Sequence, residues 1–264
     1  MVSGPRVNKL PITVSMISGA EAGRIGRALK SVVDWAGEII VVLNEDVRDG
    51  TEEIAVKHGA KVFREPWKGF VGQKNSAADK ATQPWLLNLD ADEAVSPALA
   101  EEIGRVVSDA AAAHAVYKFP RCSFYCGRWI RHGDWYPDYV RRLWRKGAVR
   151  WIGREPHASL EIQGQDGRLR SDLQHYPMET INHQIAKTVK YADDFVQHCA
   201  EQKQSVNFLD LLVRPPWRFL RAYVFKLGFL DGWQGFSIAW LTAFYTFLRY
   251  VRVREAALPK ENGQ

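Results

Sequence analysis

Cysteine is scarce in this chain, and its three copies are Cys122, Cys126 and Cys199. Three thiols cannot form the disulfide framework of a small secreted protein, and the Cys122/Cys126 spacing lacks the second ligand pair of a structural zinc site. No apolar segment of the kind found in signal peptides follows the first basic residues. We therefore expect reduced thiols and a cytoplasmic protein.

Internal repeats and low-complexity segments are also missing from the 264 residues. Hydrophobic residues make up 46% and charged residues 25%, which excludes disordered, collagen-like and multi-span membrane proteins. The net charge is +6, yet residues 214–254 alone carry seven Lys and Arg against one Asp. A nucleic-acid binder usually spreads its positive charge over the folded domain, so this basic and aromatic tail argues against nucleic acid and favours an anionic membrane surface.

The rest of the sequence has the pattern of an α/β protein. Its first third alternates short apolar runs with helical patterns, which is typical of a mainly parallel sheet flanked by helices. Strands are expected at residues 12–17, 38–43, 61–64 and 85–89, and helices at 25–33, 51–57, 73–81 and 96–113. Further strands at 116–123 and 140–144 make the middle section mixed, and an apolar stripe from Ile181 onward predicts helix.

The last segment is predicted to be a separate helical extension. Pro215 and Pro216 interrupt the helical pattern, so we place a domain boundary after residue 213. The predicted domain 1–213 has a nucleotide-binding half, about 10–93, and an acceptor half, about 94–213. Residues 232–248 are too short and too polar for a transmembrane helix, which needs about 20 apolar residues. We expect the tail, 214–264, to lie in the membrane interface, with packing on the catalytic domain or in an oligomer as the alternative.

A pair of acids follows the fourth predicted strand, at Asp90 and Asp92. Ligands of open α/β sheets bind beyond the carboxyl ends of the strands. Two acids one residue apart can direct their oxygens toward a shared Mg²⁺ or Mn²⁺ that bridges to a diphosphate. Because Asp-x-Asp is also common in solvated surface turns, the pair alone does not establish a site.

Neighbouring motifs supply the context for this pair. They are residues 38–42 (EIIVV), 49–51 (DGT), 69–75 (GFVGQKN), 87–93 (LNLDADE), 135–138 (WYPD), 142–145 (RLWR) and 229–232 (FLDG). Together they resemble the inverting family 2 glycosyltransferases of the nucleotide-diphospho-sugar transferase (GT-A) fold, particularly the lipopolysaccharide core-biosynthesis subgroup that includes β-1,4-glucosyltransferases. The resemblance covers roughly the whole chain and is most specific before residue 160.

The resemblance implies a role for individual side chains. The implied nucleotide contacts are Ser18, Glu21, Asn44, Lys74 and Asp90. Asp92, together with Asp90, is the implied ligand of Mg²⁺ or Mn²⁺, which neutralises the departing nucleoside diphosphate in place of a general acid. Asn44 departs from the family, which commonly has Asp there to accept from the uracil imide, but its carbonyl oxygen can still accept. A UDP-sugar is therefore the favoured donor.

An inverting transfer also needs a general base for the acceptor hydroxyl. Residues 153–158 align with a stretch in which relatives often have His-Glu, and Ala158 replaces that Glu. We name Glu155 and His157 as the catalytic candidates, with Asp134 and Asp138 as fallbacks. A structural hydrogen bond is the alternative role for His157.

Other polar residues are less specific. The basic residues between 141 and 154 bind either a diphosphate or an anionic acceptor, or simply face solvent. Three further histidines show no metal-ligand spacing and receive no role: His175, His183 and His198.

The sequence thus predicts a metal-dependent inverting glycosyltransferase, peripheral on the inner face of the inner membrane. It is expected to move a hexose, with glucose from UDP-glucose favoured, onto the lipopolysaccharide inner core or a related lipid-linked glycan. A sugar nucleotidylyltransferase shares the sheet architecture, but residues 14–23 hold only two glycines where that enzyme needs a Gly-rich phosphate loop. A non-catalytic membrane-bound scaffold is the other alternative, because Asn44 and Ala158 depart from the family pattern.

Overall fold

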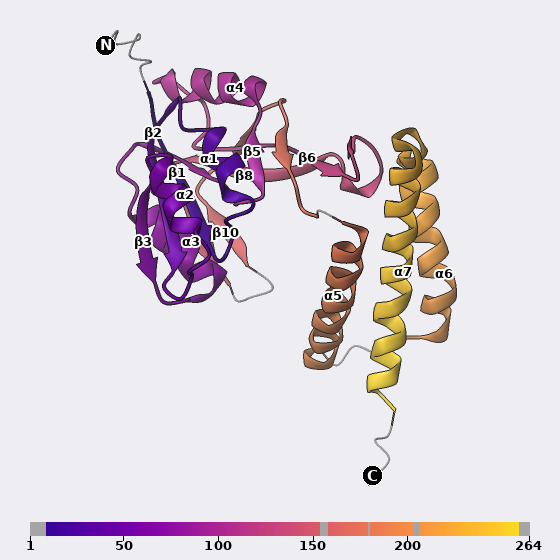
Figure 1. The fold of residues 1–264 in the computed structure, drawn as a ribbon. Helices are drawn as coiled ribbons and strands as arrows, with labels where there is room; N and C mark the ends of the chain where they lie inside the picture. Colours follow the sequence, from indigo (N-terminus) through magenta and orange to yellow (C-terminus); the bar gives the residue numbers. More distant parts are fainter. Residues whose placement is uncertain (1–8, 154–157, 179, 203–205, 259–264) are drawn as a thin grey trace. The chain divides into compact units, whose positions relative to one another are not determined.

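The computed structural model describes residues 9–153, 158–178, 180–202 and 206–258. The chain folds into two compact units (Figure 1). The sheet unit consists of residues up to Arg121 together with Asp138–His175, and the helical unit consists of Cys122–Pro137 together with the residues from Tyr176 onward. The predicted boundary after residue 213 instead falls inside a helix of the helical unit.

Four parallel strands form one half of the main sheet. They are β1 (Leu10–Ser18), β2 (Ala36–Asn44), β3 (Lys61–Glu65) and β4 (Trp85–Asn88), in the order β3-β2-β1-β4. Each coincides with a predicted strand. The side chains of β1, β2 and β4 are almost continuously buried, as expected for strands covered on both faces.

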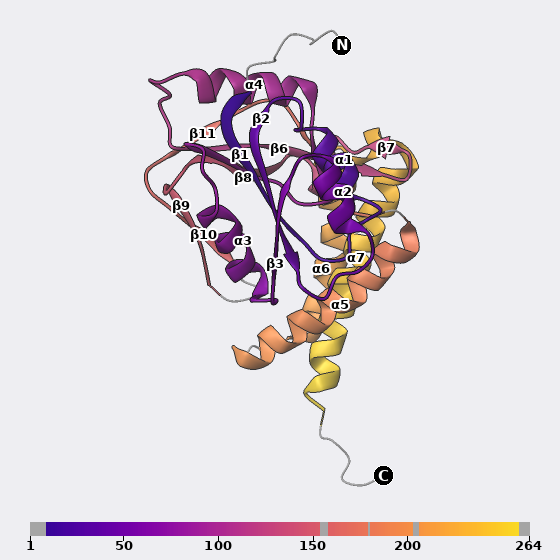
Figure 2. The same ribbon diagram turned by 60° about the vertical axis from the view of Figure 1, so that its left-hand side comes forward.

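Antiparallel strands continue the sheet beyond β4. The order is β8 (Asp138–Arg145), β6 (Val116–Tyr125), β12 (Leu173–His175) and β5 (Glu93–Val95). Two short strands pair with β6, namely β11 (Asp166–Arg168) in the sheet unit and β7 (Arg128–Trp129) in the helical unit. A separate hairpin is formed by β9 (Val149–Ile152) and β10 (Ser159–Ile162), with β9 beside helix α3 (Figure 2).

Helices cover both faces of the parallel strands. One face packs against α1 (Ile25–Lys30), α2 (Thr51–Lys57) and α4 (Pro97–Ser108), and the other against α3 (Gly69–Asp79). Alternation along β2 explains this, because Ile39 and Val41 point to the first face while Ile40 and Val42 point to the second. Ser96 caps α4 as predicted, since its Oγ accepts from the Leu99 amide at 3.2 Å.

The described residues of the helical unit form three long helices and three short turns of helix. The long ones are α5 (Ile181–Glu201), α6 (Phe208–Leu220) and α7 (Gly232–Ala256), and the short ones are η1 (Gly133–Trp135), η2 (Arg221–Phe225) and η3 (Gly228–Asp231). Helix α7 lies beside both α5 and α6 (Figure 1). None of the helices in the described parts of the chain has the length and apolar character that a membrane span requires.

The predicted break at the two prolines is wrong. Helix α6 runs through Pro215 and Pro216, although proline removes a backbone donor from a helix. Asn207 and Asp210 form a capping box at its start, Pro215 is buried, and α7 packs along its length. Tertiary packing of this kind contributes most of a helix's stability in a protein and here outweighs the local propensity.

Candidate active site

A cavity lies at the carboxyl edge of the parallel strands. β1, β2 and β4 end there, and Asp90 and Asp92 follow β4 directly. The cavity has a volume of about 470 Å³ and is lined by Ile17, Ser18, Gly19, Glu21, Asn44, Trp67, Phe70, Lys74, Asp90, Ala91 and Asp92. The structure therefore brings together every predicted nucleotide contact and both predicted metal ligands.

The loop after β1 is held by the turn that begins α2. The Glu21 amide donates to Thr51 Oγ1 at 2.9 Å, and the Ala22 amide donates to Asp49 Oδ2 at 3.1 Å. Hydrogen bonds from Thr51 and Ala22 lower the pKa of Asp49, so this carboxylate is ionised in its anchoring role. The Glu21 side chain pairs with Arg24 at 2.6 Å. The DGT motif thus shapes one wall of the cavity.

Asp90 is held between two cations. Lys74 Nζ, on α3, donates to Oδ1 at 3.0 Å, and Arg142, on β8, donates to Oδ2. Burial would raise the pKa of Asp90, but the charges of Arg142 and Lys74 hold it well below its usual range. Both oxygens of this carboxylate already have a charged partner.

These contacts continue into a longer row of alternating charges. Arg142 also donates to Glu93 Oε1 at 2.7 Å, and Arg121 donates to the same oxygen at 3.1 Å. Arg121 Nη2 in turn lies 2.6 Å from Asp138 Oδ2. We call this set the charge row, and its order is Lys74, Asp90, Arg142, Glu93, Arg121 and Asp138. Three positive charges balance three negative ones.

Asp92 stands outside the charge row. Its side chain is 25% exposed and lines the cavity, and its ion-pair partner among the described residues is His175, with Nε2 3.6 Å from Oδ2. Burial would raise the pKa of Asp92, but the hydrogen bond and charge of His175 lower it. His175 received no role from the sequence. The pairing of β12 with β5, which sets His175 opposite Glu93, carries it to this position.

The donor set around Asp92 is small. The described residues contain no cluster of three or more His, Cys, Asp or Glu side chains arranged to hold a metal. Mg²⁺ and Mn²⁺ are often bound through one or two carboxylates, with substrate phosphates and water supplying the other oxygens. Asp92 fits such a cation, provided that a diphosphate occupies the cavity.

The far wall of the cavity is aromatic. Trp67 and Phe70 are about half exposed, and their rings meet edge to face with centroids 4.9 Å apart. Asn44 also lines the cavity, and its Oδ1 accepts from Gln73 Nε2 at 3.2 Å. The carbonyl oxygen assigned to the uracil imide therefore has one partner already and a second lone pair left. Trp67 was not predicted as a site residue, because no local pattern distinguishes a tryptophan that lines a cavity from one that packs in the core.

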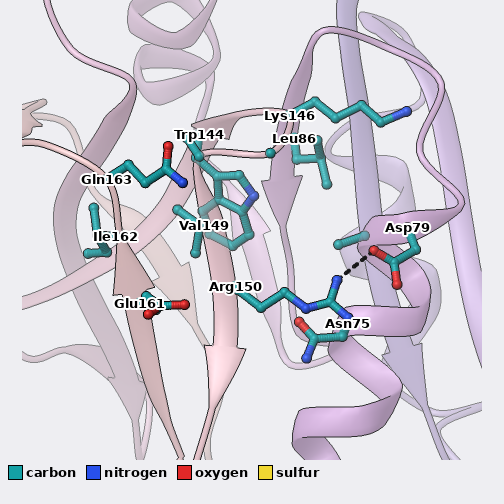
Figure 3. Close-up of a pocket in the computed structure, with 13 residues that line it drawn as sticks. Asn75, Asp79, Leu86, Trp144, Lys146, Val149, Arg150, Glu161, Ile162 and Gln163 are labelled. Atoms are coloured by element: carbon teal, nitrogen blue, oxygen red, sulfur yellow. Dashed lines mark hydrogen bonds and ion pairs between the residues drawn. The ribbon is translucent and has the colours of Figure 1, made fainter.

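A second cavity of about 790 Å³ lies between α3 and the β9–β10 hairpin (Figure 3). Asn75 fixes the hairpin, because its side-chain amide exchanges two hydrogen bonds with the Trp151 backbone at 2.9 and 3.0 Å. Arg150 pairs with Asp79 across the cavity at 2.8 Å (Figure 3). The predicted site residues that the structure describes do not line it. Lys74, which faces the first cavity, also lies over the Trp151 ring at 4.6 Å, so α3 contributes to both.

The structure describes two of the four candidates for the general base, Asp134 and Asp138. Glu155 and His157 lie outside the described residues. Asp134 belongs to the helical unit and is surrounded there by three cations, at 2.5 Å from Arg221, 2.9 Å from Lys226 and 3.2 Å from Arg218. Asp138 begins β8, at the edge of the sheet where β4 ends, and is the exposed end of the charge row.

The chain is similar to known glycosyltransferases. Residues 13–164, more than half of the chain, match the family model "Glycosyl transferase family 2". An uncharacterized glycosyltransferase of Rickettsia typhi is 30% identical over 261 residues, which cover 95% of this chain and 89% of the relative. LpsC of Rhizobium meliloti, a lipopolysaccharide core biosynthesis glycosyltransferase, is 28% identical over 261 residues, with 94% and 93% covered.

Solved structures share the fold at low identity. The mannosyltransferase PcManGT of Pyrobaculum calidifontis, in complex with GDP-Man and Mn²⁺, has a TM-score of 0.53 and 13% identity, covering 97% of this chain and 90% of its own. S. aureus TarS 1-349 with UDP-GlcNAc has a TM-score of 0.51 and 12% identity, covering 93% and 90%. The predicted fold class, a GT-A sheet flanked by helices with a C-terminal helical extension, is confirmed. Because the family model spans the strands and loops that form the cavity, the chain belongs to glycosyl transferase family 2.

Proposed function

We propose that this glycosyltransferase moves a hexose from a nucleoside diphosphate sugar to an acceptor hydroxyl, with inversion at the anomeric carbon and with UDP-glucose as the favoured donor. Asp92 carries the proposal. Its carboxylate lines the cavity at the end of β4 and lies outside the balanced charge row, so it is the acid best placed to bind a cation. Mg²⁺ or Mn²⁺ bound there would neutralise the charge that develops on the departing diphosphate.

The other lining residues suit the remaining parts of the donor. Trp67 and Phe70 offer exposed ring faces for the nucleobase, and Asn44 offers an amide for its edge. Lys74 carries a positive charge toward the phosphates. Asp90 is fixed by its two cations, and its remaining lone pairs can accept from ribose hydroxyls. Ser18 and Glu21 complete the wall formed by the loop after β1.

The acceptor must lose a proton as its oxygen attacks. The acceptor oxygen bonds to the anomeric carbon, the bond from that carbon to the diphosphate oxygen breaks, and a base takes the hydroxyl proton. Glu155 and His157 remain the proposed bases. Asp138 is a third candidate, because β8 places it at the same edge of the sheet as Asp92. Replacing each in turn with its amide, or with Gln for His157, tests which one the transfer needs.

We further propose that the acceptor is a lipid-linked glycan such as the lipopolysaccharide inner core, met at the inner face of the inner membrane. The name of the relative LpsC supports this acceptor class. The helical unit supports the location, because α6 and α7 both expose large apolar side chains, among them Trp217, Phe236 and Trp240. The same surface would also serve an oligomer, which is the competing use of these helices.

Donor turnover tests the enzymatic proposal. The purified chain is incubated with UDP-glucose and other nucleotide sugars with Mn²⁺, with Mg²⁺, or with a chelator, and release of the diphosphate is followed. We expect slow hydrolysis that requires the metal and is fastest with a UDP-sugar, and a glycoside product of opposite anomeric configuration when acceptor is added. Consumption of a nucleoside triphosphate with a sugar phosphate would instead show a nucleotidylyltransferase. Failure to bind any nucleotide sugar would leave the scaffold alternative.

A further inference from the structure

The helical unit contains an excess of positive charge around one acid. Asp134, in η1, is only 6% exposed, and three basic side chains converge on it from η2 and the ends of the neighbouring elements. Arg221 and Lys226 lie 2.5 and 2.9 Å from its Oδ1, and Arg218 lies 3.2 Å from its Oδ2. One negative charge cannot balance three positive ones. Each of the three cations remains more than one third exposed, so the surplus faces solvent.

The nearby acid Asp231 does not cancel this surplus. It is almost completely buried and accepts from the Arg131 and His132 amides at 2.9 and 2.8 Å. The His132 ring lies 3.1 Å and Arg128 lies 3.9 Å from the same carboxylate. Asp231 thus anchors the loop that carries Asp134 and has its own partners.

The backbone around the three cations is tightly packed. The Gly133 amide donates to the Lys226 carbonyl at 2.9 Å. A Cβ atom on Gly228 would lie 2.6 Å from the Ala222 carbonyl oxygen, and one on Gly235 would lie 1.9 Å from the Gly228 carbonyl oxygen. The turn between α6 and α7 therefore has little freedom to rearrange, and it holds the basic side chains as a preformed group.

Apolar side chains surround this group in the sequence of the turn. The large apolar side chains next to the three cations in the sequence are exposed, and Phe225 is the most exposed at 67%. These side chains are Trp217, Val224, Phe225, Leu227, Phe229 and Leu230. A surface that exposes aromatic and aliphatic groups next to Arg and Lys matches the interface of a bilayer, where apolar groups enter the acyl region and cations stay at the phosphates.

We propose that Arg218, Arg221 and Lys226 form a binding site for the phosphate monoester headgroup of a membrane lipid. The two surplus positive charges match the charge of a phosphate monoester, about −1.5 to −2 near neutral pH. The two guanidinium groups can each donate two hydrogen bonds to one phosphate, whereas a diester offers fewer oxygens and less charge. The proposal rests on the membrane location put forward under "Proposed function" and adds a specific headgroup to it.

Vesicle co-sedimentation of the full chain tests this site. The vesicles contain phosphatidylcholine alone, or with phosphatidylglycerol or phosphatidic acid added to the same surface charge. We expect the strongest binding to phosphatidic acid, and about a tenfold loss there for the double variant R221Q/K226Q. The matched control R105Q/K190Q removes one exposed Arg and one exposed Lys outside the tail and should lose less than about twofold.

The variant Asp134→Asn gives an effect in the opposite direction. Removing the carboxylate releases the three cations, so binding to phosphatidic acid should increase by several-fold. This variant therefore tests the phosphate site even if R221Q/K226Q fails to fold. Equal losses in the two double variants would overturn the site and leave general charge attraction. An Asp134→Asn variant that binds phosphatidic acid no better than the wild type would also overturn the site. Wild-type chain that binds no vesicle at all would overturn the membrane location as well, while donor turnover in solution would be unaffected.

Discussion

The two units of this protein each hold a carboxylate among several cations, and the two clusters differ in their charge balance. In the sheet unit, Asp90 belongs to the charge row, where three acids face three basic residues. In the helical unit, Asp134 is the one acid among the described residues that pairs with Arg218, Arg221 and Lys226. The first cluster is neutral as a whole, and the second is positive.

This difference determines which ligand each cluster can attract. Because the charge row satisfies its own members, the acid beside it, Asp92, is left as a negative group in the cavity and suits a cation. Because the cluster around Asp134 has a surplus of cations, it suits an anion. In our proposals, similar elements, a carboxylate and converging basic side chains, therefore belong to a metal–diphosphate site in one unit and to a phosphate site in the other.

The largest effect is expected from Asp92→Asn, which removes the acid left outside the charge row. Turnover of the donor with Mn²⁺ should fall by about 10³-fold, because the charge on the leaving diphosphate is no longer neutralised through this ligand. Diphosphate release in the steady state measures it. The control Asp79→Asn changes an exposed acid on the second cavity and should retain nearly full activity. Equal activity in both variants would contradict the assignment.

Breaking the charge row itself should affect stability. Arg142→Met leaves Asp90 and the buried Glu93 without their shared partner, so the free energy of unfolding should fall by about 3–5 kcal/mol. Urea denaturation followed by circular dichroism gives this value. Arg141→Met, which removes an exposed partner of Asp166, should cost less than about 1 kcal/mol. A small loss for Arg142→Met would show that the row does not hold the cavity together.

Glu38 is a third carboxylate with a basic partner, and it lies in the interior of the sheet unit. Burial would raise its pKa, but hydrogen bonds from Lys61 and from two threonines lower it from its ordinary 4.5 to about 2. A lowered pKa in the folded state stabilises the protein fully above about pH 4.5, and this contribution is lost as the pH falls from there toward 2.

The variant Glu38→Gln tests that linkage. We expect it to unfold about 2 kcal/mol more easily at neutral pH and to show a flatter decline of stability between pH 4.5 and 2 than the wild type. Thermal melts across this pH range measure both effects. Parallel pH curves for the two proteins would show that another group controls the acid unfolding.

The smallest effect concerns the aromatic wall. Trp67→Ala should weaken UDP binding by about five- to tenfold, because the nucleobase loses a ring face worth roughly 1 kcal/mol. Calorimetric titration with UDP and Mn²⁺ measures the dissociation constant. Trp217→Ala removes an equally exposed tryptophan from the helical unit and should leave UDP affinity unchanged while weakening binding to vesicles. The opposite pattern would reverse the roles given to the two units.

The sequence predicted the part of the site that local pattern determines. Apolar runs placed β1, β2 and β4, and the rule that ligands bind beyond the carboxyl ends of the strands selected Asp90 and Asp92. Ser18 and Asn44 were implied by the resemblance to family 2 glycosyltransferases. The long apolar stripe beginning at Ile181 likewise predicted α5 correctly.

Features that depend on long-range packing were not predictable in the same way. His175 reaches Asp92 only because β12 pairs antiparallel with β5. No local sequence pattern predicts that pairing. Arg142 appeared as one of several basic residues, and only the register of β8 against β4 directs it to Asp90. The continuity of α6 through Pro215 likewise depends on packing against α7.

The uptake of Mn²⁺ tests the central claim most directly. Electron paramagnetic resonance of Mn²⁺ titrated with the wild-type chain should show tight binding only when UDP is present, because Asp92 supplies one ligand and the diphosphate supplies others. Asp92→Asn should abolish this UDP-dependent uptake, whereas Asp79→Asn should retain it. Uptake that is the same in the Asp92 variant, or that occurs equally without UDP, would contradict the account.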